Sequence, residues 1–480
     1  MKIVMVASES NPLIKTGGLA DVVYSLSREL VKNGHEVFVF IPYYKKLKDK
    51  KLKAKKVSYD FVDMSWRHQY LGVYDYAVDG INFKLIDNEQ YFGRDGIYGY
   101  DDDGERFAFF TLAVRQVIHN EKIKPDIVHV HDWQAGMLPA LMKGAPLDKT
   151  KTHFVLTIHN PAFKGYLDKM ALGNLYNLSD DMYDSGAVRL ENKVSTLKAG
   201  IYFADKITTV SPTHRNELLT KELSQGLSEV LEYRKDDFIG IVNGIDVIEF
   251  NPETDKNITA NYKKSAYKIN RKLCKEALLK QFGLKNLTAP TYGLVSRLTW
   301  QKGIKLILEN LDYLMSRGAN VILLGNGEYE LEQALESYRN RYPNQIGIYI
   351  GYNDELAHQI YAGCDFFLMP SLFEPCGIGQ IIAQRYGTLP IVRETGGLVD
   401  TVHAEVDGFS FSEFSGFSMR CVLDRALNLY YCDKEFIDRL RANALSLDRS
   451  WKDSASLYEG VYKELMNKWV TITRKLKKNG

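Results

Sequence analysis

The sequence predicts an α/β protein of two domains, and three observations lead to this prediction. Short apolar runs recur along the 480 residues, and most are separated by stretches long enough for one or more helices. Within each run the apolar residues are nearly consecutive, which is typical of parallel strands that helices cover on both faces. The runs fall into two series, with a polar, Lys-rich stretch at about residues 251–275 between them. Each series is long enough for one large α/β domain.

The first series predicts a parallel sheet in the N-terminal half of the chain. Its strands are expected at Lys2–Ala7, Glu36–Ile41, Asp126–Val130, Phe154–Ile158, Lys206–Val210 and Phe238–Val242. Residues 57–87 differ, because their residues alternate in the manner of antiparallel hairpin strands. These strands are expected at Val57–Phe61, Gln69–Ala77 and Ile81–Ile86, with Asp79-Gly80 as a turn. The sequence therefore predicts a β-insert at one edge of the first sheet.

The second series predicts a second sheet of the same kind. Its strands are expected at Tyr292–Val295, Val321–Leu324, Ile346–Ile350, Phe366–Met369 and Pro390–Val392. The domain boundary is expected near Asn243–Asp246, where Gly244 permits a sharp turn. Apolar residues at three- and four-residue steps then predict a long amphipathic helix, namely Leu457, Val461, Leu465, Trp469 and Ile472. We expect domains at residues 1–245 and 246–455, followed by this helix at 456–480.

The composition excludes several classes of protein. Apolar residues make up 45% and charged residues 25%, as in an ordinary globular protein. Lys and Arg total 62 against 60 for Asp and Glu, so the charge is too balanced for a nucleic-acid-coating protein. The five cysteines form no C-x-x-C pair, and no apolar segment is long enough for a signal peptide or a membrane helix. We expect a cytoplasmic protein with neither a nucleic acid nor a membrane as its partner.

A glycine-rich segment, Lys15-Thr-Gly-Gly-Leu-Ala-Asp-Val22, follows the first strand after a short loop. It lies at the carboxyl end of a parallel sheet, where open α/β folds bind ligands. Gly17 and Gly18 permit a close approach to a ligand, and a helix that begins near Leu19 directs its N–H groups at an anion. The alternative is a glycine-rich turn beside a solvated lysine.

Histidines end two neighbouring strands of the first series. His129-Val-His-Asp-Trp133 ends one strand and His159-Asn160 ends the next, so these side chains could hydrogen-bond a polyol. A metal site at His129, His131 and Asp132 is an alternative, but no further residues complete a ligand set. His129 is more typical of a hydrogen-bonded core histidine, and no metal is expected.

Two cations follow the first strand of the second series. Arg297 and Lys302 lie in Ser296-Arg-Leu-Thr-Trp-Gln-Lys-Gly303, a spacing that could hold a diphosphate without a metal. The alternative is that both are ordinary exposed basic residues. The run of eight lysines from Lys45 to Lys56 is interpreted as a solvated loop or helix face, with a polyanion site as the alternative.

A carboxylate precedes a predicted helix start in Pro370-Ser-Leu-Phe-Glu-Pro-Cys-Gly-Ile-Gly-Gln380. Free amides at that helix start would hold a phosphate, and Glu374 would face whatever the phosphate carries. Downstream, Arg393-Glu-Thr-Gly-Gly-Leu398 is similar to the first glycine-rich segment. This similarity supports the prediction of two domains of one kind.

Together these segments resemble the bacterial glycogen synthases and plant starch synthases, which are retaining glucosyltransferases. The resemblance starts at Lys15–Val22 and extends along nearly the whole chain. It also rests on His131-Asp-Trp133, Thr157-Ile-His-Asn160, Asn243-Gly-Ile-Asp246, Ser296-Arg-Leu-Thr299, Gln301-Lys-Gly303, Phe373-Glu-Pro-Cys-Gly377, Arg385-Tyr-Gly387 and Thr395-Gly-Gly-Leu398. Found in this order, the motifs are highly specific.

The resemblance implies the GT-B fold, in which two Rossmann-like domains face each other across a deep cleft. It implies an ADP-glucose donor and an α-1,4-glucan acceptor, glycogen or a maltooligosaccharide, with no cofactor. The residues that it marks as catalytic are Glu374, which holds the donor glucose, Lys302 and Arg297, which neutralise the departing diphosphate, and His159 beside the sugar ring. The substrate-binding residues are expected to be Lys15, Gly17, Gly18, Asp21, His131, Asp132, Asn160, Asn243, Cys376, Gly377, Ile378, Gly379 and Thr395.

The chain departs from the family pattern in two segments. Phe163-Lys164-Gly165 stands where the family mostly has Gln after the aromatic residue, and Pro161 stiffens the same loop. Gly379 stands where a Thr is usual, which removes a hydroxyl but keeps the backbone amide. Two further hypotheses therefore stand beside glucan elongation: a transferase for another sugar or acceptor, and a weakly active glucan-binding paralogue with a regulatory role. The presence of Lys15, Arg297, Lys302 and Glu374 argues against the latter.

Overall fold

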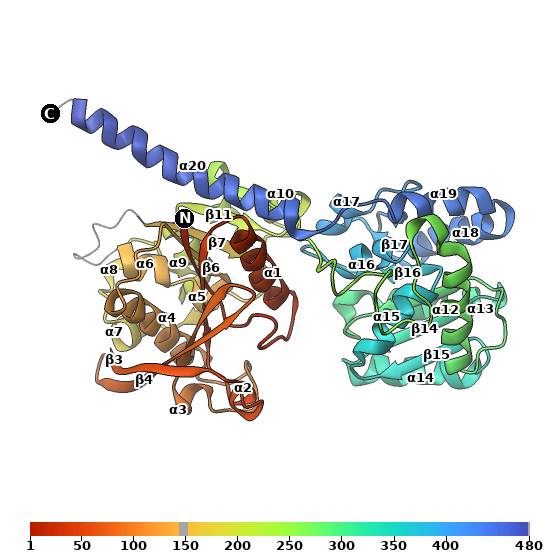
Figure 1. Cartoon of the computed structure of the whole chain (residues 1–480), viewed down its shortest axis with the longest axis horizontal. Coiled ribbons are helices and arrows are strands. Elements are labelled where there is room, and N and C mark those ends of the chain that lie inside the picture. The colour runs from red at the N-terminus through yellow and green to blue at the C-terminus, as the bar shows by residue number, and fades with distance from the viewer. Residues whose placement is uncertain (144–151, 479–480) are drawn as a thin grey trace. The chain divides into compact units, whose positions relative to one another are not determined.

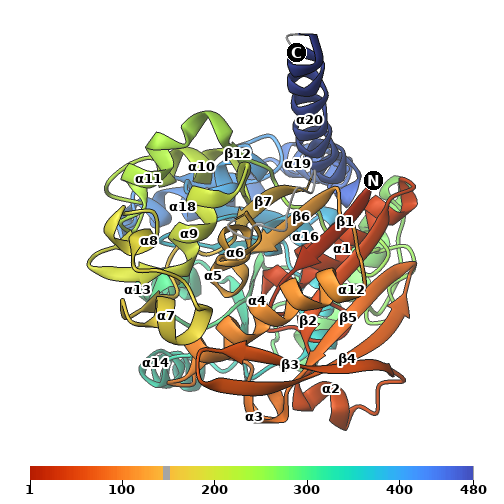
Figure 2. The ribbon, with the colours of Figure 1, turned by 90° about the vertical axis from the view of Figure 1, so that its left-hand side faces the viewer.

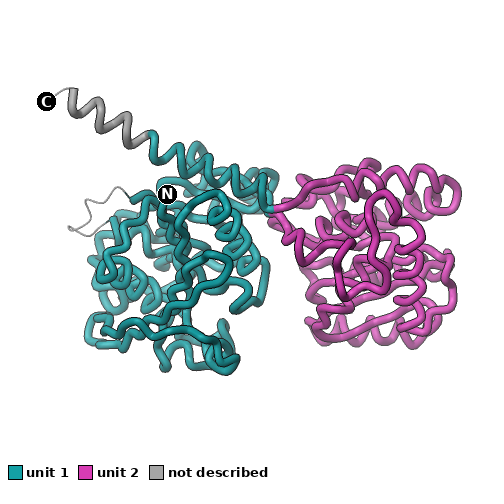
Figure 3. The backbone as a smooth tube through the Cα atoms, in the orientation of Figure 1, with its two compact units in different colours: residues 1–243, 451–480 teal, residues 244–450 magenta. Residues whose placement is uncertain are grey.

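The structure, a computed structural model, describes residues 1–143 and 152–478, with side chains up to residue 467. The chain forms two compact units, coloured separately in Figure 3. Unit 1 comprises Met1–Asn243 together with Trp451–Gly480, and unit 2 comprises Gly244–Ser450. The chain thus leaves unit 1 after Asn243 and returns to it at Trp451.

Unit 1 is built on a nine-stranded sheet with the order β12-β11-β7-β6-β1-β2-β5-β4-β3 (Figure 1). The first seven strands in this order are parallel. The strands are β1 (Lys2–Val6), β2 (Glu36–Pro42), β3 (Lys55–Met64), β4 (Arg67–Val78), β5 (Ile81–Asp87), β6 (Ile127–His131), β7 (His153–Ile158), β11 (Lys206–Thr209) and β12 (Phe238–Gly240). The first series of apolar runs therefore predicted six of these seven parallel strands to within a few residues, and β5 is the exception.

The long hairpin β3–β4 extends this sheet at one edge (Figure 2). The predicted β-insert includes the next strand, β5. In the structure, β5 pairs in parallel with β2 as well as antiparallel with β4. The two-residue turn that joins β4 to β5 has positive φ at both Asp79 and Gly80. Because side-chain alternation does not reveal strand direction, the sequence missed that β5 belongs to the parallel sheet.

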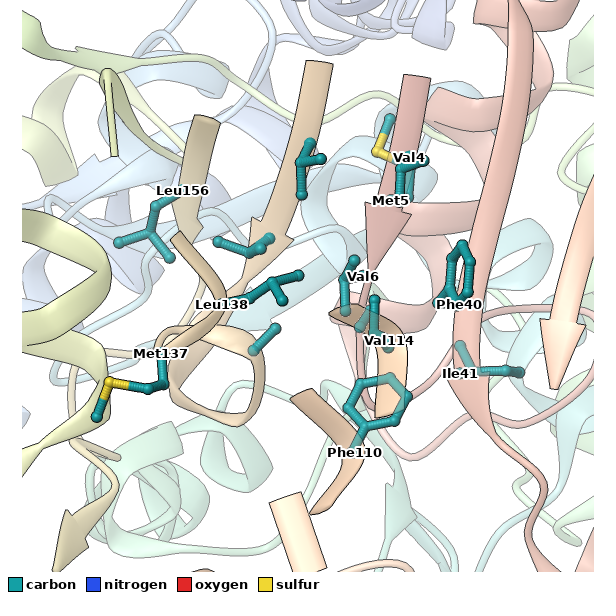
Figure 4. Close-up of a cluster of buried hydrophobic side chains, with 14 of the residues drawn as sticks. Val4, Met5, Val6, Phe40, Ile41, Phe110, Val114, Met137, Leu138 and Leu156 are labelled. Atoms are coloured by element: carbon teal, nitrogen blue, oxygen red, sulfur yellow. The ribbon is translucent and has the colours of Figure 1, made fainter. Parts of the chain in front are cut away.

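Helices cover the sheet of unit 1 and complete its core. The main helices are α1 (Gly18–Lys32), α4 (Asp103–Asn120), α5 (Asp132–Ala135), α6 (Leu138–Lys143), α9 (Thr196–Phe203), α10 (Pro212–Leu218) and α20 (Trp451–Lys478). Figure 4 shows how apolar side chains of the strands, such as Val6 and Leu156, lie beside Phe110 and Val114 of α4 and Leu138 of α6. These side chains are fully buried, which is the condition for a parallel sheet covered on both faces.

The terminal helix α20 packs on unit 1 with a face that matches the predicted one in part, because Val461 and Leu465 are buried as expected. Its buried apolar residues are Trp451, Ala455, Tyr458, Val461, Tyr462 and Leu465. Leu457, which we placed on the apolar face, is 58% exposed. The packed face follows the tyrosines, because Tyr462 donates or accepts a hydrogen bond of 2.8 Å with His129. The predicted Trp469 and Ile472 lie beyond the residues whose side chains are described.

Unit 2 contains a six-stranded parallel sheet with the order β15-β14-β13-β16-β17-β18. Its strands are β13 (Thr291–Val295), β14 (Asn320–Gly325), β15 (Ile346–Ile350), β16 (Phe366–Met369), β17 (Leu389–Arg393) and β18 (Phe409–Phe411). The main helices are α12 (Tyr267–Gln281), α13 (Ile304–Ser316), α14 (Tyr329–Arg341), α15 (Asp354–Gly363), α16 (Gly379–Arg385), α17 (Gly397–Thr401), α18 (Gly416–Cys432) and α19 (Lys434–Ala444). The sequence did not predict β18, whose Phe-Ser-Phe run is too short to form an apolar series.

Two smaller features complete the description. A three-stranded sheet, which the sequence did not predict, joins β8 (Tyr166–Leu167), β10 (Lys193–Ser195) and β9 (Arg189–Leu190). The lysine run forms the short helix α2 (Lys45–Asp49) and the start of β3, and most of its lysines are exposed. Among the described residues, we find no helix with the length and apolarity that a membrane crossing requires.

Candidate active site

A buried carboxylate accepts hydrogen bonds from the glycine-rich segment of unit 1 and holds it in place. Glu9 is 3% exposed, and it accepts hydrogen bonds from the backbone N–H and the hydroxyl of Thr16. Burial raises the pKa of Glu9, while the bonds from Thr16 oppose this effect. Sequence reasoning missed Glu9, although its place just after β1 marked it as a strand-end carboxylate. It fixes the loop that carries Lys15.

Lys15 and Asp21 lie together at the start of α1. The ammonium of Lys15 is 2.8 Å from Oδ2 of Asp21, and Asn11 donates a hydrogen bond to the other carboxylate oxygen. Between them, Gly17 and Gly18 open the helix with no side-chain cap, and a Cβ at either position would meet open space. The predicted residues of this segment are therefore brought together beside uncapped helix amides.

His129 lies in the core of unit 1 and has both ring nitrogens occupied. It is fully buried between the hydroxyls of Tyr462 and Thr157, at 2.8 and 2.6 Å. Burial lowers its pKa to about 3, so the ring is neutral. This agrees with the prediction of a core histidine and leaves no ring nitrogen for the metal site considered above.

His131 and His159 form a neutral pair at the ends of β6 and β7. Nδ1 of His131 is 2.9 Å from Nε2 of His159, so one ring donates a proton and the other accepts it. Burial lowers the pKa of His159 to about 3 and also lowers that of His131. Such a pair fixes the orientation of both rings without adding a positive charge.

Asp132 ties these histidines to the following loop. Its Oδ1 accepts hydrogen bonds from the backbone N–H of His159 at 2.7 Å and of Asn160 at 3.3 Å. Burial raises its pKa to about 7, against the effect of these two bonds. Asn243 ends unit 1 with a buried side chain, whose Oδ1 accepts no hydrogen bond within the described part of the chain. Asp132 is thus well placed to hold the loop, and Asn243 keeps an acceptor available.

In unit 2, the predicted carboxylate and one predicted cation are in contact. The ammonium of Lys302 lies 2.5 Å from Oε2 of Glu374, and the hydroxyl of Ser371 donates to the same oxygen at 3.0 Å. Glu374 is only 7% exposed, so this contact is shielded from water. Ser371 was not singled out from the sequence.

Arg297 follows β13 and is exposed. Among the residues that the structure describes, its guanidinium has no hydrogen-bond or ion-pair partner. The loop that carries both cations turns sharply at Gly303, where φ is +71° and a Cβ would lie 2.0 Å from the carbonyl oxygen of Pro370. This close approach brings the loop with both cations (the cation loop) against Pro370–Gln380, the segment that carries Glu374 (the Glu374 segment).

The segment Cys376–Gly379 precedes and opens α16. Gly377 has a φ of +70°, and α16 has no side-chain cap. The backbone N–H groups of Gly377, Ile378 and Gly379 donate no hydrogen bond to any described residue. These partly exposed amides are free to bind an acceptor.

The second glycine-rich segment packs against the backbone of the Glu374 segment. A Cβ at Gly396 would lie 2.1 Å from the carbonyl oxygen of Glu374, and one at Gly397 would lie 2.3 Å from that of Cys376. Arg393 donates to the carbonyl of Ser371 at 2.9 Å and also to that of Leu372. Sequence reasoning missed this supporting role of Arg393, because the contact is formed between segments far apart in the chain. Thr395 is buried at the start of this support.

The two departures from the family pattern have distinct surroundings. Gly379 packs on the sheet, and a Cβ there would lie 3.0 Å from the ring of Phe367, so a larger residue requires that ring to shift. Partial burial lowers the pKa of Lys164, against the attraction of Glu191. The backbone of Lys164 is fixed by the hydroxyl of Ser195, which donates to its carbonyl at 2.7 Å.

Comparison with known proteins gives a family match for each of the two units. Residues 2–233 match the family model described as "Starch synthase catalytic domain", and residues 276–441 match "Glycosyl transferases group 1". The chain is 41% identical to the glycogen synthase of Lactococcus lactis, over 97% of this chain and 100% of the relative. It is 42% identical to that of Geobacillus thermodenitrificans, over 98% of each chain.

Solved structures agree. The catalytic domain of starch synthase IV from Arabidopsis thaliana, bound to ADP and acarbose, is 31% identical with a TM-score of 0.90, over 97% of this chain and 99% of that one. A sucrose-phosphate synthase from Thermosynechococcus elongatus has a TM-score of 0.61 at 15% identity, over 97% of this chain and 99% of that one, which shows the fold alone.

Two Rossmann-like units with these matches define a glycosyltransferase of the GT-B class. The identity to curated relatives over nearly the whole chain is more specific than the class. The chain belongs to the glycogen synthase family and is a hexosyltransferase.

Proposed function

We propose that the chain transfers glucose from ADP-glucose to the non-reducing end of an α-1,4-glucan, glycogen or a maltooligosaccharide, with retention at the anomeric carbon. The observation that carries this proposal is a set of groups on two adjoining segments of unit 2, the cation loop and the Glu374 segment. Lys302 contacts Glu374, Arg297 has no described partner, and the amides of Gly377–Gly379 are free. This set suits a donor with a charged diphosphate next to a neutral sugar.

In this proposal each group has one role. The bond between the anomeric carbon and the diphosphate oxygen breaks, and that carbon bonds to the oxygen of an acceptor hydroxyl, whose proton passes to the departing diphosphate as ADP leaves. Lys302, Arg297 and the free amides stabilise the negative charge that grows on the diphosphate. Because these groups compensate the charge, the proposal requires no metal ion for transfer. Glu374 binds the glucose hydroxyls and positions the ring.

Unit 1 supplies the remaining groups. The neutral pair of His159 with His131 donates and accepts hydrogen bonds beside the sugar, and Asp132 and Asn160 hold that loop. Lys15 adds a cation near the diphosphate. We assign acceptor binding to residues 1–245 and nucleotide-sugar binding to residues 246–455. Neither unit carries the complete set.

One observation favours a second candidate, a transferase of the same class with another sugar or acceptor. Lys164 follows the His159 loop and is partly buried, with a lowered pKa. A cation in that place could select a substrate that carries a negatively charged or hydrogen-bond-accepting group which glucose lacks. The presence of Lys15, Arg297, Lys302 and Glu374 gives no support to a weakly active regulatory paralogue.

The test compares two donors on one acceptor. The protein is incubated with glycogen and either ADP-glucose or UDP-glucose, and release of the nucleoside diphosphate is followed together with glucan elongation. We expect faster elongation with ADP-glucose. Faster turnover with UDP-glucose would contradict the donor assignment, and nucleotide release without elongation would favour a different acceptor.

A further inference from the structure

A buried histidine of unit 2 lies outside the residues assigned to transfer. His358, on α15, is 1% exposed, and its ring stacks on Phe250 with the ring centroids 4.9 Å apart. Its Nδ1 is 2.7 Å from Oδ2 of Asp255. Asp255 also accepts a hydrogen bond from the hydroxyl of Tyr386 at 2.5 Å and one from the backbone N–H of Asn257 at 2.9 Å. These contacts fix the ring in a single orientation.

The other ring nitrogen of His358 has no partner. Nε2 is buried, yet it makes no hydrogen bond to any residue that the structure describes. A buried polar atom without a partner is costly and uncommon, so this nitrogen calls for a ligand or an ion. The orientation set by Asp255 leaves Nε2 as the available ring nitrogen.

Two carboxylates converge on this histidine. Asp354 begins α15 and lies one helical turn before His358, so both side chains occupy the same side of the helix. Glu249 comes from the turn that follows Gly244, where Asp246 accepts hydrogen bonds from the backbone N–H groups of Ile248 and Glu249. One possible ligand atom from each of Glu249, Asp354 and His358 lies within 4.8 Å of the other two.

We propose that Glu249, Asp354 and His358 bind one divalent first-row transition-metal ion. An imidazole nitrogen with two carboxylate oxygens is a ligand set that suits Zn²⁺ or Mn²⁺ rather than Mg²⁺ or Ca²⁺. Asp255 has the place of the carboxylate that commonly orients a metal-binding histidine through its second ring nitrogen. Water completes the coordination.

The arrangement needs only a small movement to close. Ligands at about 2.0–2.2 Å from a tetrahedral ion lie about 3.3 Å from one another. The exposed carboxylates of Glu249 and Asp354 would exchange present contacts for the ion, among them the bond that Asp354 accepts from the hydroxyl of Tyr352 at 3.3 Å, whereas the buried ring of His358 stays in place. The bound ion would tie the turn at residues 246–250 to α15. Because none of these three residues is among those that we assign to glucose transfer, the ion has a structural role.

The test measures metal binding by the full chain, independently of transfer. Cys421 and Cys432 are exposed thiols on α18 that could bind Zn²⁺ themselves, so both are first replaced by Ser. The protein is dialysed against a chelator and titrated with Zn²⁺ by calorimetry, and Co²⁺ absorption reports the ligand type. We expect one ion per chain, a higher Tm with Zn²⁺, and no comparable response to Mg²⁺.

Two variants identify the ligands. Asp354→Asn and Glu249→Gln should each weaken Zn²⁺ binding by about 10–100-fold or more, whereas Tm in chelator should change little because both side chains are exposed and their present contacts lie at the surface. Glu355→Gln, at the neighbouring exposed acid of α15, is the matched control and should bind as the parent does. Absence of Zn²⁺ binding would overturn the proposal. Equal binding by the ligand variants and the control would also overturn it.

Discussion

The ammonium of Lys302 lies 2.5 Å from the carboxylate of Glu374, at the point where a cation loop and a glycine-rich segment meet in unit 2. A buried carboxylate next to a lysine is stable only while the two charges compensate each other. A diphosphate that binds to Lys302 competes with Glu374 for this ammonium. The contact therefore links donor binding to the freedom of Glu374 to bind the sugar.

Replacing Glu374 by Gln tests that link. The variant loses the carboxylate that we assign to the donor glucose, so transfer should fall by about 10²–10³-fold or more. ADP binding should persist or become tighter, because Lys302 no longer shares its charge with a carboxylate. Nucleotide release and calorimetric titration with ADP check the two effects. Loss of ADP binding with an intact fold would contradict this assignment, and a trapped glucosyl adduct on Glu374 would show a covalent role instead.

The two cations should differ in their effect on stability. Arg297→Ala and Lys302→Ala should each lower turnover by about 10²–10³-fold, the usual loss for one preorganised charge at a transition state. Arg297→Ala should leave Tm unchanged, since the residue is exposed without a described partner. Lys302→Ala should lower Tm, because it leaves the buried Glu374 without its cation.

Lys305→Ala serves as the control for both cation variants. Lys305 is an exposed lysine three residues after Lys302. It should retain normal turnover and Tm. If Arg297→Ala also retains normal turnover, Arg297 is an ordinary surface residue.

Asp132 predicts a specific dependence of stability on pH. Its pKa is about 7 in the folded protein, above the ordinary value of 3.8, because burial disfavours the charged form. The folded state therefore holds this proton more tightly than the unfolded state, so its contribution to stability decreases as pH rises from about 4 to about 7. Asp132→Asn keeps an oxygen that can accept from the amides of His159 and Asn160 but stays neutral.

The urea midpoints of the parent and of Asp132→Asn should be similar near pH 4, and the variant should become the more stable of the two by pH 8. Asp181→Asn, at an exposed carboxylate of α8 (Asp181–Asp184), should show no such trend. A difference that is the same at both pH values would refute the raised pKa.

Gly396 should be sensitive to the smallest side chain. In Gly396→Ala the new Cβ would lie 2.1 Å from the carbonyl oxygen of Glu374, at a residue with φ of +46°. The Glu374 segment must then move, so both Tm and turnover should fall strongly. Gly318→Ala also has a positive φ but meets no atom within 4 Å, so it should lower Tm slightly and leave turnover unchanged. Equal behaviour of the two variants would show that the close approach has no functional role.

Much of the fold followed from one local signal, the short apolar runs. They predicted the parallel strands of both sheets because a strand buried on both faces leaves little room for polar residues. The same signal failed at β5, whose direction depends on a partner strand rather than on its own residues. It also failed at β18, where three residues are too few to show a pattern.

The site was predicted less evenly. Motif order singled out Glu374 and Lys302, which the structure brings into contact, but nothing local to Arg393 indicates that it donates to two carbonyls of the Glu374 segment. The Glu249–Asp354–His358 group was equally hidden, since Glu249 is far from the other two in the chain. Such contacts depend on how segments pack, which a single sequence does not specify.

The return of α20 to unit 1 has a consequence for how the protein is made. Chains emerge from the ribosome with the N-terminus first, and domains tend to fold as they appear. Unit 2 is one continuous segment and can fold as soon as it has emerged. Unit 1 must wait for Trp451–Leu465, because Tyr462 supplies the hydroxyl that His129 needs in its core. The unit that is translated first is therefore completed last, after the whole of unit 2 has been made.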